Sequence, residues 1–268
     1  MTSTLEILIP VRDPDDGLAR TAASLAAQTD RRFEVRLSDN FSRTGREHLE
    51  AAEKQLLAAG ITVGRAKTPV ELKRLEHWNW AQAQARADWL KPVLSGELLK
   101  PEYIARLRRR LEEKPQAQFV RCDAELRTEW GVETLRAPFG EASITAAQFG
   151  DSFPTKVDWI CRAANVAYSR MAWLATGGYC NQLPGFASLN LNVTLALHHG
   201  LENIAEPLVA VESADRLSLN ESRGERVNLP LELWLILRQA RNYCLAAKVP
   251  WRCERPWRRA AAAWAGHW

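Results

Sequence analysis

The sequence predicts an α/β fold, in which a mostly parallel β-sheet is covered by helices on both faces. Two observations lead to this fold class. Short apolar runs closed by turn formers alternate with longer segments whose apolar residues recur at helical spacing, and four such strand-then-helix units fill residues 1–115. Parallel neighbouring strands need helical crossovers of this kind, and their sheet needs cover on both faces. The 268 residues are 46% hydrophobic and 25% charged, which excludes a disordered, collagen-like or coiled-coil chain.

The elements of the first half follow in order. Leu5–Val11 is the first expected strand, and it ends at the turn formers Asp13–Gly17. Apolar residues then recur at helical spacing from Leu18, with Asp15 or Asp16 as the N-cap. Further strands are expected at residues 33–37, 61–66, 89–94 and 118–122, and further helices at residues 46–59, 71–87 and 101–114.

The pattern changes in the second half. A hairpin is expected over Glu125–Leu135, turning at Trp130 and Gly131. Gly177 and Gly178 supply the left-handed stop that commonly ends a helix. Strands are expected at residues 165–168 and 204–211, and helices at residues 170–175, 189–198 and from Asn228 onward.

The carboxyl ends of the predicted strands indicate where a ligand binds, because ligands of open α/β sheets lie in the crevice outside those ends. Three of the ends carry polar side chains and turn-forming residues: Pro10–Asp13, Ser38–Asn40 and Ser95–Glu97. We therefore expect the loops after the first, second and fourth strands to meet and form the binding site.

Four segments resemble, in order, the motifs of one enzyme family. The family's first strand, nucleotide turn and helix are similar to residues 7–29, ILIPVRDPDDGLARTAASLAAQT, and its second strand and acidic turn are similar to residues 33–45, FEVRLSDNFSRTG. Its Asn-containing helix and the strand before its acidic pair look like residues 77–104, HWNWAQAQARADWLKPVLSGELLKPEYI. Its Gly-Gly turn and following helix match residues 176–200, TGGYCNQLPGFASLNLNVTLALHHG. Over about residues 4–215 the chain thus resembles the family 2 glycosyltransferases of the GT-A fold.

The resemblance implies inverting transfer of a sugar from a nucleotide-diphosphate sugar to the hydroxyl of a glycan or lipid-linked acceptor, in the synthesis of a cell-surface polysaccharide or glycoconjugate. It also implies a domain organisation. Residues 1–227 would form the GT-A domain, with a nucleotide-binding half at 1–123 and an acceptor half at 124–227. Residues 228–268 would form C-terminal helices that end in a tail rich in Trp and Arg.

The donor site follows from the matched turns. The first turn of the chain aligns with the family's nucleotide turn, Asp39 aligns with its base- or ribose-binding aspartate, and Arg12 could stack its planar guanidinium on a base. A simple turn-forming role for Asp39 and Asn40 is the other interpretation. The expected donor contacts are Pro10, Val11, Arg12, Asp13, Asp39, Asn40, Arg74, Asn79, Lys91 and Ser95.

The diphosphate site departs from the family pattern. Ser-Asp-Asp-Leu-Leu is replaced here by Ser-Gly-Glu-Leu-Leu, residues 95–99. Glu97 is the remaining carboxylate and is expected as a catalytic group and as the ligand of a Mg²⁺ or Mn²⁺ ion, because one or two carboxylates with substrate phosphates can hold such an ion. Lys73, Arg74 and Lys91 could supply the positive charge instead. A solvated helix face is the other interpretation of Lys73 and Arg74.

The catalytic base is the second departure. In-line displacement requires a proton acceptor across the sugar carbon from the leaving diphosphate. Ala187 and Ser188 stand where the family has Glu-Asp, and neither takes up a proton at neutral pH. Asp158, which precedes a segment expected to face the crevice, is the expected base. Its alternatives are Glu212, Asp215, His198 and His199.

The C-terminal tail differs in charge from the rest of the chain. Residues 251–268 hold four of the 11 tryptophans, and Arg252, Arg255, Arg258 and Arg259 against Glu254 give the tail a net charge of +3. The whole chain carries +4, so the remainder is near +1 and nucleic-acid binding is not expected. Tryptophan beside arginine suits the interface of an anionic membrane, while packing on the domain or on a partner is the alternative.

The compartment is predicted from two further features. No secretory signal pattern is evident, and the five cysteines are odd in number without a CxxC pair. Both favour a reducing compartment. We expect a cytoplasmic protein that binds the inner face of the membrane peripherally.

Two other function classes remain open. The changes at Gly96 and at Ala187–Ser188 favour a catalytically degenerate glycosyltransferase-like protein that acts as a binding or scaffolding partner. A nucleotidyltransferase would require a Gly-rich, Lys-bearing phosphate loop after the first strand, and Arg12–Asp15 is not such a loop.

Overall fold

The computed structural model describes residues 3–152, 160, 162–212 and 229–247. The strands are β1 (Leu5–Val11), β2 (Glu34–Asp39), β3 (Thr62–Lys67), β4 (Trp89–Pro92), β5 (Leu98–Leu99), β6 (Phe119–Thr128), β7 (Gly131–Leu135), β8 (Ala142–Ile144), β9 (Val166–Ser169) and β10 (Leu201–Glu212). The helices are α1 (Asp16–Ala26), α2 (Arg46–Ala58), α3 (Arg74–Ala83), α4 (Tyr103–Glu113), α5 (Ala146–Ser152), α6 (Arg170–Thr176), α7 (Ala187–His199) and α9 (Leu229–Ala246).

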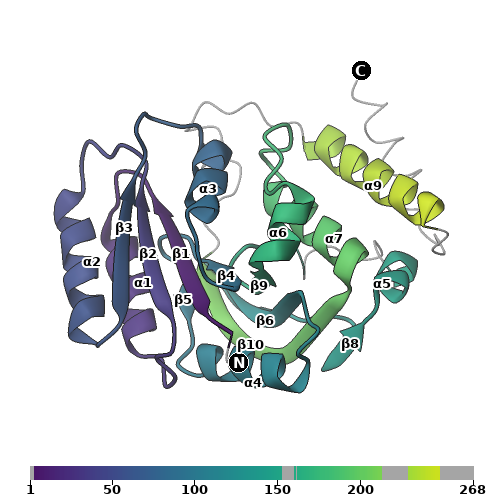
Figure 1. Ribbon diagram of the computed structural model, residues 1–268, viewed down its shortest axis with the longest axis horizontal. Helices are drawn as coiled ribbons and strands as arrows, with labels where there is room; N and C mark the ends of the chain where they lie inside the picture. The colour runs from purple at the N-terminus through teal and green to yellow at the C-terminus, as the bar shows by residue number, and fades with distance from the viewer. Residues whose placement is uncertain (1–2, 153–159, 161, 213–228, 248–268) are drawn as a thin grey trace.

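One sheet runs through the molecule in the order β3-β2-β1-β4-β9-β6-β10-β5, with β7 on β6 and β8 on β10 (Figure 1). β1 is parallel to β2 and β4, and β2 is parallel to β3. β9 is antiparallel to both β4 and β6, so β6 and its parallel neighbour β10 point the same way as β1–β4. Six strands therefore share one direction, which confirms the mostly parallel α/β fold.

Two hydrophobic cores lie on opposite faces of this sheet. The alternation of β1 shows why: Ile7 and Ile9 belong to the core that includes side chains of α1, α2 and α4, whereas Leu8 belongs to the core that includes side chains of α3, α6, α7 and α9. A strand buried on both faces is mostly apolar, as the run LEILIPV is, and its one charged residue, Glu6, is buried in an ion pair with Arg36.

Several boundaries differ from the sequence-based expectation. The helix expected at 71–87 covers only α3, because the backbone N–H of Arg86 donates to the carboxylate of Glu6 (3.0 Å) beyond the helix end. The strand expected at 118–122 and the first arm of the expected hairpin are one strand, β6. β5, β8 and α5 were not expected; β5 and β8 are only two and three residues long and are formed by pairing with β10.

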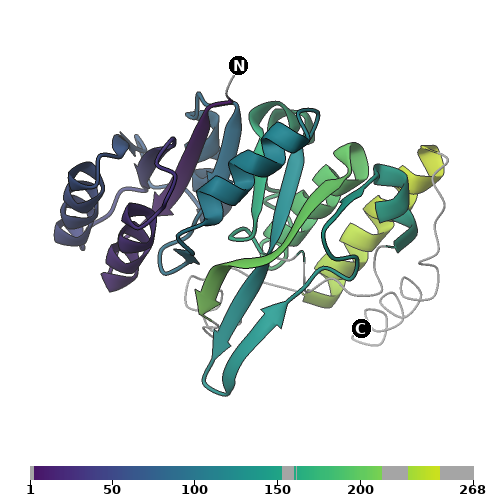
Figure 2. The same cartoon turned by 90° about the horizontal axis from the view of Figure 1, so that it is seen from below.

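The carboxyl ends of β1, β2, β4 and β6 lie at one edge of the sheet, since these strands point in one direction. From this edge the β6–β7 hairpin projects away from the body, with Trp130 at its tip 89% exposed (Figure 2). α9 packs on α7 at the other end of the molecule from β3 (Figure 1). None of the helices in the described part of the chain has the length and apolar character needed to cross a bilayer.

Candidate active site

The β1 and β2 loops are joined through Asp13. Its Oδ1 accepts hydrogen bonds from the backbone N–H groups of Arg43 (2.7 Å) and Thr44 (3.0 Å), and its own N–H donates to Ser42 Oγ (2.9 Å). These N–H donors, first that of Thr44 and then that of Arg43, lower the pKa of the Asp13 carboxyl below its ordinary value. Gly45 allows the two loops to lie this close together. Any side chain at position 45 would place its Cβ 2.0 Å from the carbonyl oxygen of Pro14.

The β4 loop rests on the first turns of α1. Glu97 N–H donates to the Leu94 carbonyl (3.0 Å) with Gly96 at φ +90°, the geometry of a turn that requires glycine at its third position. Thr21 Oγ1 accepts from Gly96 N–H (2.9 Å) and donates to the Glu97 carbonyl (2.9 Å). Gly17 permits this approach, since a Cβ there would lie 3.1 Å from Ser95 Oγ. The expected meeting of the three loops is confirmed.

The Glu97 side chain is bound within its own turn rather than exposed to a ligand. The residue is 8% exposed, and its Oε2 accepts a hydrogen bond from Leu94 N–H at 2.7 Å. Burial raises the pKa of Glu97, opposed by the Leu94 N–H and by the charges of Lys91 and Arg162. Burial is the largest of these effects, so the turn favours the neutral form of Glu97 over a metal-binding carboxylate.

The residues at this turn do not fit a divalent metal. Gly96 provides no side chain, and the single carboxylate of Glu97 is already engaged by Leu94 N–H and faced by cations. Among residues 3–152, 160, 162–212 and 229–247, no cluster of three or more His, Cys, Asp and Glu side chains gathers as a metal site would require.

Lys91 is placed in the core rather than beside a ligand. It is fully buried on β4, where its Nζ donates to the carbonyls of Ala164 and Pro92 and lies 5.2 Å from the centre of the Tyr103 ring. Burial lowers its pKa to about 8. Tyr103 begins α4, so Lys91 lies beneath the sheet face that α1 and α4 cover and does not reach the phosphate position expected for it.

Asn40 and Asn79 each hold a peptide group of another segment. Asn40 is buried; its Nδ2 donates to the Leu72 carbonyl (2.8 Å) and its Oδ1 accepts from Leu72 N–H (2.9 Å). Asn79 makes the same paired contact with the carbonyl and N–H of Tyr179, both at 2.8 Å. Gly178 makes this second contact possible, because a Cβ there would lie 2.4 Å from Asn79 Oδ1. The two amides therefore position the segments that line the edge.

The remaining predicted donor residues of the first two loops lie close together. Arg12 is half-exposed and pairs with Glu71, whose second oxygen contacts Arg43 Nη2 at 3.2 Å. Asp39 is half-buried and its Oδ1 accepts from Ser42 N–H (2.9 Å). Pro10, half-buried, and Val11, buried, form the end of β1 beside β2.

The other two predicted donor residues come from the β4 loop and from α3. Ser95 is exposed in the β4 loop. Arg74 Nη2 donates to the Pro184 carbonyl (2.7 Å), and its guanidinium lies 5.1 Å from the centre of the Trp78 ring. Arg74 thereby ties the start of α3 to the segment that enters α7.

Sequence reasoning missed two side chains beside Asp39. Phe41 has a positive φ of 57° and is 42% exposed, and the centre of its ring lies 5.2 Å from Lys67 Nζ. His77 is buried below the loop, with Nε2 2.9 Å from Ser38 Oγ, and burial lowers its pKa to about 4, so it is neutral. An aromatic directly after Asp39 and Asn40 was the available signal for Phe41, whereas His77 has none in the sequence.

The predicted catalytic bases are only partly described. Asp158, Asp215 and the side chain of Glu212 lie outside the described residues. His198 and His199 end α7 at the edge opposite the loops, and burial lowers the pKa of His199. Ala187 opens α7 without a carboxylate of its own.

A carboxylate from another helix reaches this position. Glu232 of α9 accepts a hydrogen bond from Phe186 N–H, the residue before α7, at 2.9 Å from its Oε2. The residue is 4% exposed. Forty-five or more positions separate Glu232 from the start of α7, so no local motif could have indicated the contact.

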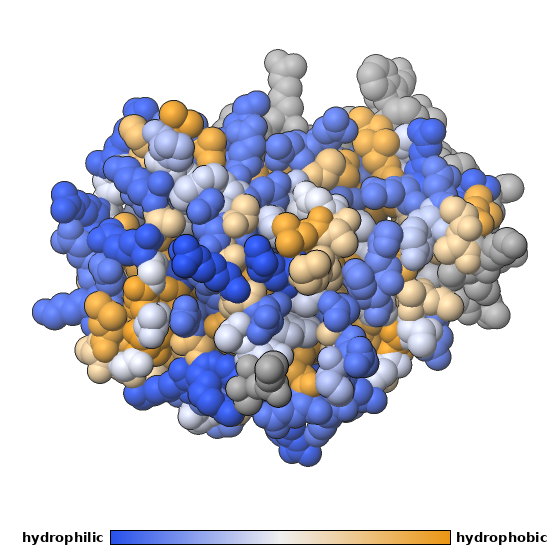
Figure 3. Space-filling model, in the orientation of Figure 1, coloured by the Kyte–Doolittle hydropathy of each residue, from blue (hydrophilic) through white to orange (hydrophobic). Residues whose placement is uncertain are grey.

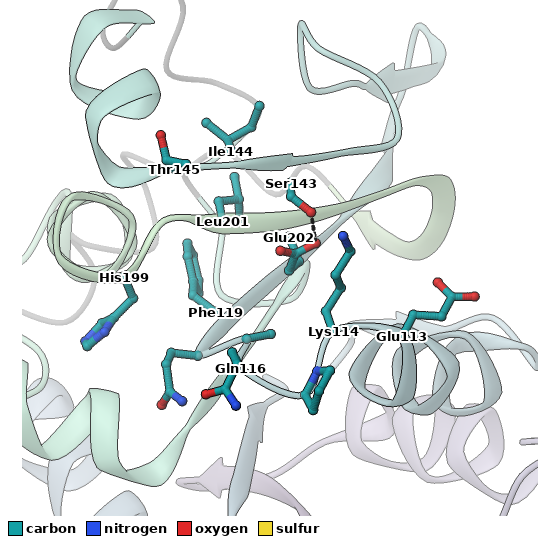
Figure 4. Close-up of a pocket in the computed structure, with 13 residues that line it drawn as sticks. Glu113, Lys114, Gln116, Phe119, Ser143, Ile144, Thr145, His199, Leu201 and Glu202 are labelled. Carbon is teal, nitrogen blue, oxygen red and sulfur yellow. Dashed lines mark hydrogen bonds between the residues drawn. The ribbon is translucent and has the colours of Figure 1, made fainter.

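Two cavities lie away from this edge. One, of about 290 Å³, lies between the end of α4, β8 and the α7–β10 turn, where Ser143 Oγ donates to Glu202 at 2.7 Å (Figure 4). The other, of about 330 Å³, lies between α7 and α9. On the face of the molecule seen in Figure 3, polar and apolar residues are interspersed.

No protein-family model matches this chain, and no curated protein sequence matches it. Solved structures do match. A crystal structure of S. aureus TarS 1–349 in complex with UDP-GlcNAc has a TM-score of 0.69 at 12% identity, over 90% of this chain and 66% of that one. The mannosyltransferase PcManGT from Pyrobaculum calidifontis, in complex with GDP-Man and Mn²⁺, has a TM-score of 0.59 at 15% identity, over all of this chain and 80% of that one. The chain thus spans just under two thirds of the TarS structure, and identities this low establish a shared fold alone.

Proposed function

We propose that this chain, whose fold is that of the GT-A glycosyltransferases, transfers a sugar from a nucleotide-sugar donor to an acceptor hydroxyl. One observation carries the proposal: at the carboxyl edge of the sheet Asp13 joins the loops after β1 and β2, and Thr21 joins the loop after β4 to α1, the helix that follows the β1 loop. This is where α/β sheets bind nucleotides.

The base and ribose of the donor are assigned to the β1 and β2 loops. The half-buried carboxylate of Asp39 can accept hydrogen bonds from ribose or base donors, and the exposed ring of Phe41 offers a stacking surface. Arg12, held by Glu71, adds positive charge at the same place. Asn40 and Lys91 are excluded from direct contact in this assignment, because their polar atoms are committed within the protein.

The diphosphate is assigned to the start of α3. Arg74 is the first residue of this helix and Lys73, exposed, precedes it. Backbone N–H groups and the dipole at a helix N-terminus favour an anion, and two cations add to that preference. Because the β4 turn does not fit a metal ion, these groups neutralise the leaving group in our proposal, and no step passes through a metal.

The finer features of the reaction remain part of the proposal. Transfer would invert the anomeric centre, the acceptor would be a glycan or lipid-linked hydroxyl, and the product would belong to a cell-surface polysaccharide or glycoconjugate. The Trp/Arg segment 251–268 lies outside the described residues. We propose that it holds a cytoplasmic enzyme at an anionic membrane surface.

Calorimetric titration with UDP, GDP and dTDP, each in EDTA and in Mn²⁺, tests the proposal. We expect one of the three to bind, binding to persist in EDTA, and Asp39→Ala to weaken it at least tenfold. Asp30→Ala is the matched control, because Asp30 is also a loop aspartate that forms a turn but precedes β2 at the opposite edge. Failure of all three nucleotides to bind would refute the proposed function.

A binding or scaffolding role is the second candidate, and Gly96 and Ala187 are the observations that favour it. Such a protein would bind a nucleotide or glycan without turnover. Release of UDP or GDP from UDP-GlcNAc or GDP-Man by the purified chain separates the two candidates, since release above the buffer rate requires catalysis.

A further inference from the structure

We propose that Trp130, at the tip of the β6–β7 hairpin, is a binding subsite for the acceptor, and that this acceptor is an uncharged chain of several sugars. The inference rests on the proposed function and names the substrate class that the same edge of the sheet takes. Four features support it: the exposure of the ring, its rigid support, its position beside the donor loops and the charge around it.

The first feature is the exposure of the indole ring. Trp130 is 89% exposed, and Val132, two residues further along the hairpin, is 64% exposed. Every other tryptophan in the described part of the chain is buried or half-buried. An indole ring left in water forgoes the free energy that its burial would contribute, so an exposed tryptophan at a projecting tip favours contact with a partner.

The second feature is the rigid support of the ring. β6 and β7 pair from Ala124 and Leu135 at the base of the hairpin to Thr128 and Gly131 at its tip (Figure 2). Thr128 Oγ1 accepts the Trp130 N–H at 3.1 Å and donates to the Gly131 carbonyl at 3.1 Å, so a side chain fixes the turn. A binding surface that is already ordered loses little conformational entropy when a ligand binds.

The third feature is the position of the hairpin beside the donor loops. β10 pairs with β5 on one side and with β6 on the other, so Leu98, Ala210 and Glu125 form one row across three strands. Lys100, the residue after β5, also forms an ion pair with Glu125. β5 directly follows the β4 loop, which is one of the three loops of the proposed donor site. The base of the hairpin is therefore attached to the donor edge.

The distance from the β4 loop to Trp130 indicates the size of the acceptor. Two strand spacings separate Leu98 from Glu125, and Trp130 lies five positions beyond Glu125. At about 4.8 Å for each strand spacing and about 3.4 Å for each residue, Trp130 lies about 15–20 Å from the β4 loop. A single sugar cannot span this distance, whereas a chain of several sugars can contact Trp130 while its terminal hydroxyl lies at the donor edge.

The fourth feature is the charge around the ring. Glu129 precedes Trp130, Glu133 follows Val132, and both glutamates are exposed. An anionic membrane surface attracts basic residues and repels acidic ones, so these carboxylates oppose membrane contact at the tip. They oppose an anionic polymer for the same reason. The charge therefore favours an uncharged partner.

The area of the tip argues against a protein partner. A tryptophan side chain buries about 150–250 Å², well below the ~800 Å² that each partner contributes to a specific protein interface. A sugar chain needs no such area. The C–H groups on one face of a sugar ring can stack on the indole of Trp130, and its hydroxyls can donate hydrogen bonds to Glu129 and Glu133.

The test uses the full chain labelled with 5-fluorotryptophan, in which the ¹⁹F signal of Trp130 is the one that Trp130→Phe removes. The probes are cellohexaose, maltohexaose and chitohexaose, with glucose and N-acetylglucosamine as single sugars. We expect at least one hexasaccharide to shift the Trp130 signal and the single sugars to bind at least tenfold more weakly.

Variants separate the acceptor subsite from the donor site. Trp130→Ala should weaken hexasaccharide binding about tenfold, because it removes the stacking surface. The affinity for UDP, GDP or dTDP should stay within about threefold, since the proposal places no nucleotide contact on the hairpin. Leu57→Ala is the matched control, because Leu57 is also an exposed apolar residue, 53% exposed, but lies on α2; it should leave both affinities unchanged.

Three results would overturn the assignment. The first is that no hexasaccharide shifts the Trp130 signal. The second is that equimolar vesicles of phosphatidylcholine and phosphatidylglycerol shift it and the hexasaccharides do not, which would make the tip a membrane contact. The third is that the signal changes with protein concentration alone, which would make it a contact between two copies of the chain.

Failure of the proposed function gives a different result. If a hexasaccharide binds at Trp130 but none of UDP, GDP and dTDP binds, the donor site is refuted while the glycan contact stands. If a nucleotide binds and no hexasaccharide shifts the Trp130 signal, the acceptor subsite is refuted and the donor site stands.

Discussion

Asp13 Oδ1 lies 3.0 Å from the backbone nitrogen of Thr44, and this hydrogen bond joins the loop after β1 to the loop after β2. Asp13 adopts a positive φ of 46° to make the contact, a conformation that aspartate tolerates better than most residues. Asp13 thus holds together the two loops of the proposed nucleotide site, whereas the sequence resemblance predicts that it contacts the nucleotide-sugar donor.

Replacing Asp13 by Asn should therefore loosen the site and lower stability. Asn keeps the side-chain oxygen but loses the charge, and because the side chain is 40% exposed we expect a loss of only about 1 kcal/mol in the free energy of unfolding at pH 7. The pKa of Asp13 is lowered in the folded state, so its contribution is present above the unfolded value near 3.8 and is lost as the pH falls through the folded value. Urea unfolding of both proteins should give curves that differ at pH 7 and converge at acidic pH, once Asp13 is protonated in the folded state; a constant difference would contradict the mechanism.

Gly96→Asp should destabilise the chain although it places a second carboxylate beside Glu97. The residue has φ +90°, and a side chain in that region costs about 1–2 kcal/mol. Space is not the limit, because the nearest atom to a new Cβ is Arg20 Nη2 at 3.9 Å. Chemical denaturation should show this loss, and Gly64→Ala, at a strand position without positive φ, should not. Stronger nucleotide binding in Mn²⁺ than in EDTA for Gly96→Asp would show that the turn can hold a metal after all.

The effects of Gly178→Ala and Asn79→Ala on the free energy of unfolding should not be additive. Alanine at 178 faces φ +78° and a contact of 2.4 Å with Asn79 Oδ1, so we expect it to cost about 3 kcal/mol. Asn79→Ala removes two hydrogen bonds to Tyr179 and should cost about 2 kcal/mol. With the amide gone the clash disappears, so the double variant should be more stable than the sum of the single effects predicts. If denaturant unfolding shows that the two stability losses simply add, the paired hydrogen bonds between Asn79 and Tyr179 do not form as described.

His77 should make stability depend on pH in the mildly acidic range. Burial lowers its pKa from 6.5 to about 4, so between these values the unfolded chain binds more protons than the folded one. Stability should be complete above pH 6.5 and decrease as the pH falls toward 4, by about 3 kcal/mol at most. Urea midpoints measured from pH 7.5 to 4 test this, with His77→Gln as the comparison, since glutamine does not titrate. A variant that follows the same pH curve as the original protein would exclude His77 as the cause.

The first half of the fold could be predicted from the sequence because its information is local. LEILIPV forms β1 because its residues are apolar, apart from Glu6, and therefore suit a strand buried on both faces. Asp15 caps the start of α1, where its side chain accepts a hydrogen bond from Gly17 N–H at 2.9 Å. The second half was harder, because β5 and β8 are too short for any periodic signal and exist only through pairing with β10.

The site shows the same division. The sequence alone determined that the polar turns after β1, β2 and β4 meet at one edge, because strands that point the same way bring their ends together. Only the tertiary structure decided what each side chain does there: Asn40 and Asn79 bind peptide groups, Lys91 is buried under α4, and Glu232 reaches α7 from another helix. The positions of strands and helices along the chain follow from local patterns, whereas the strand order in the sheet, burial and the pairing of distant residues depend on tertiary packing, which no local pattern specifies.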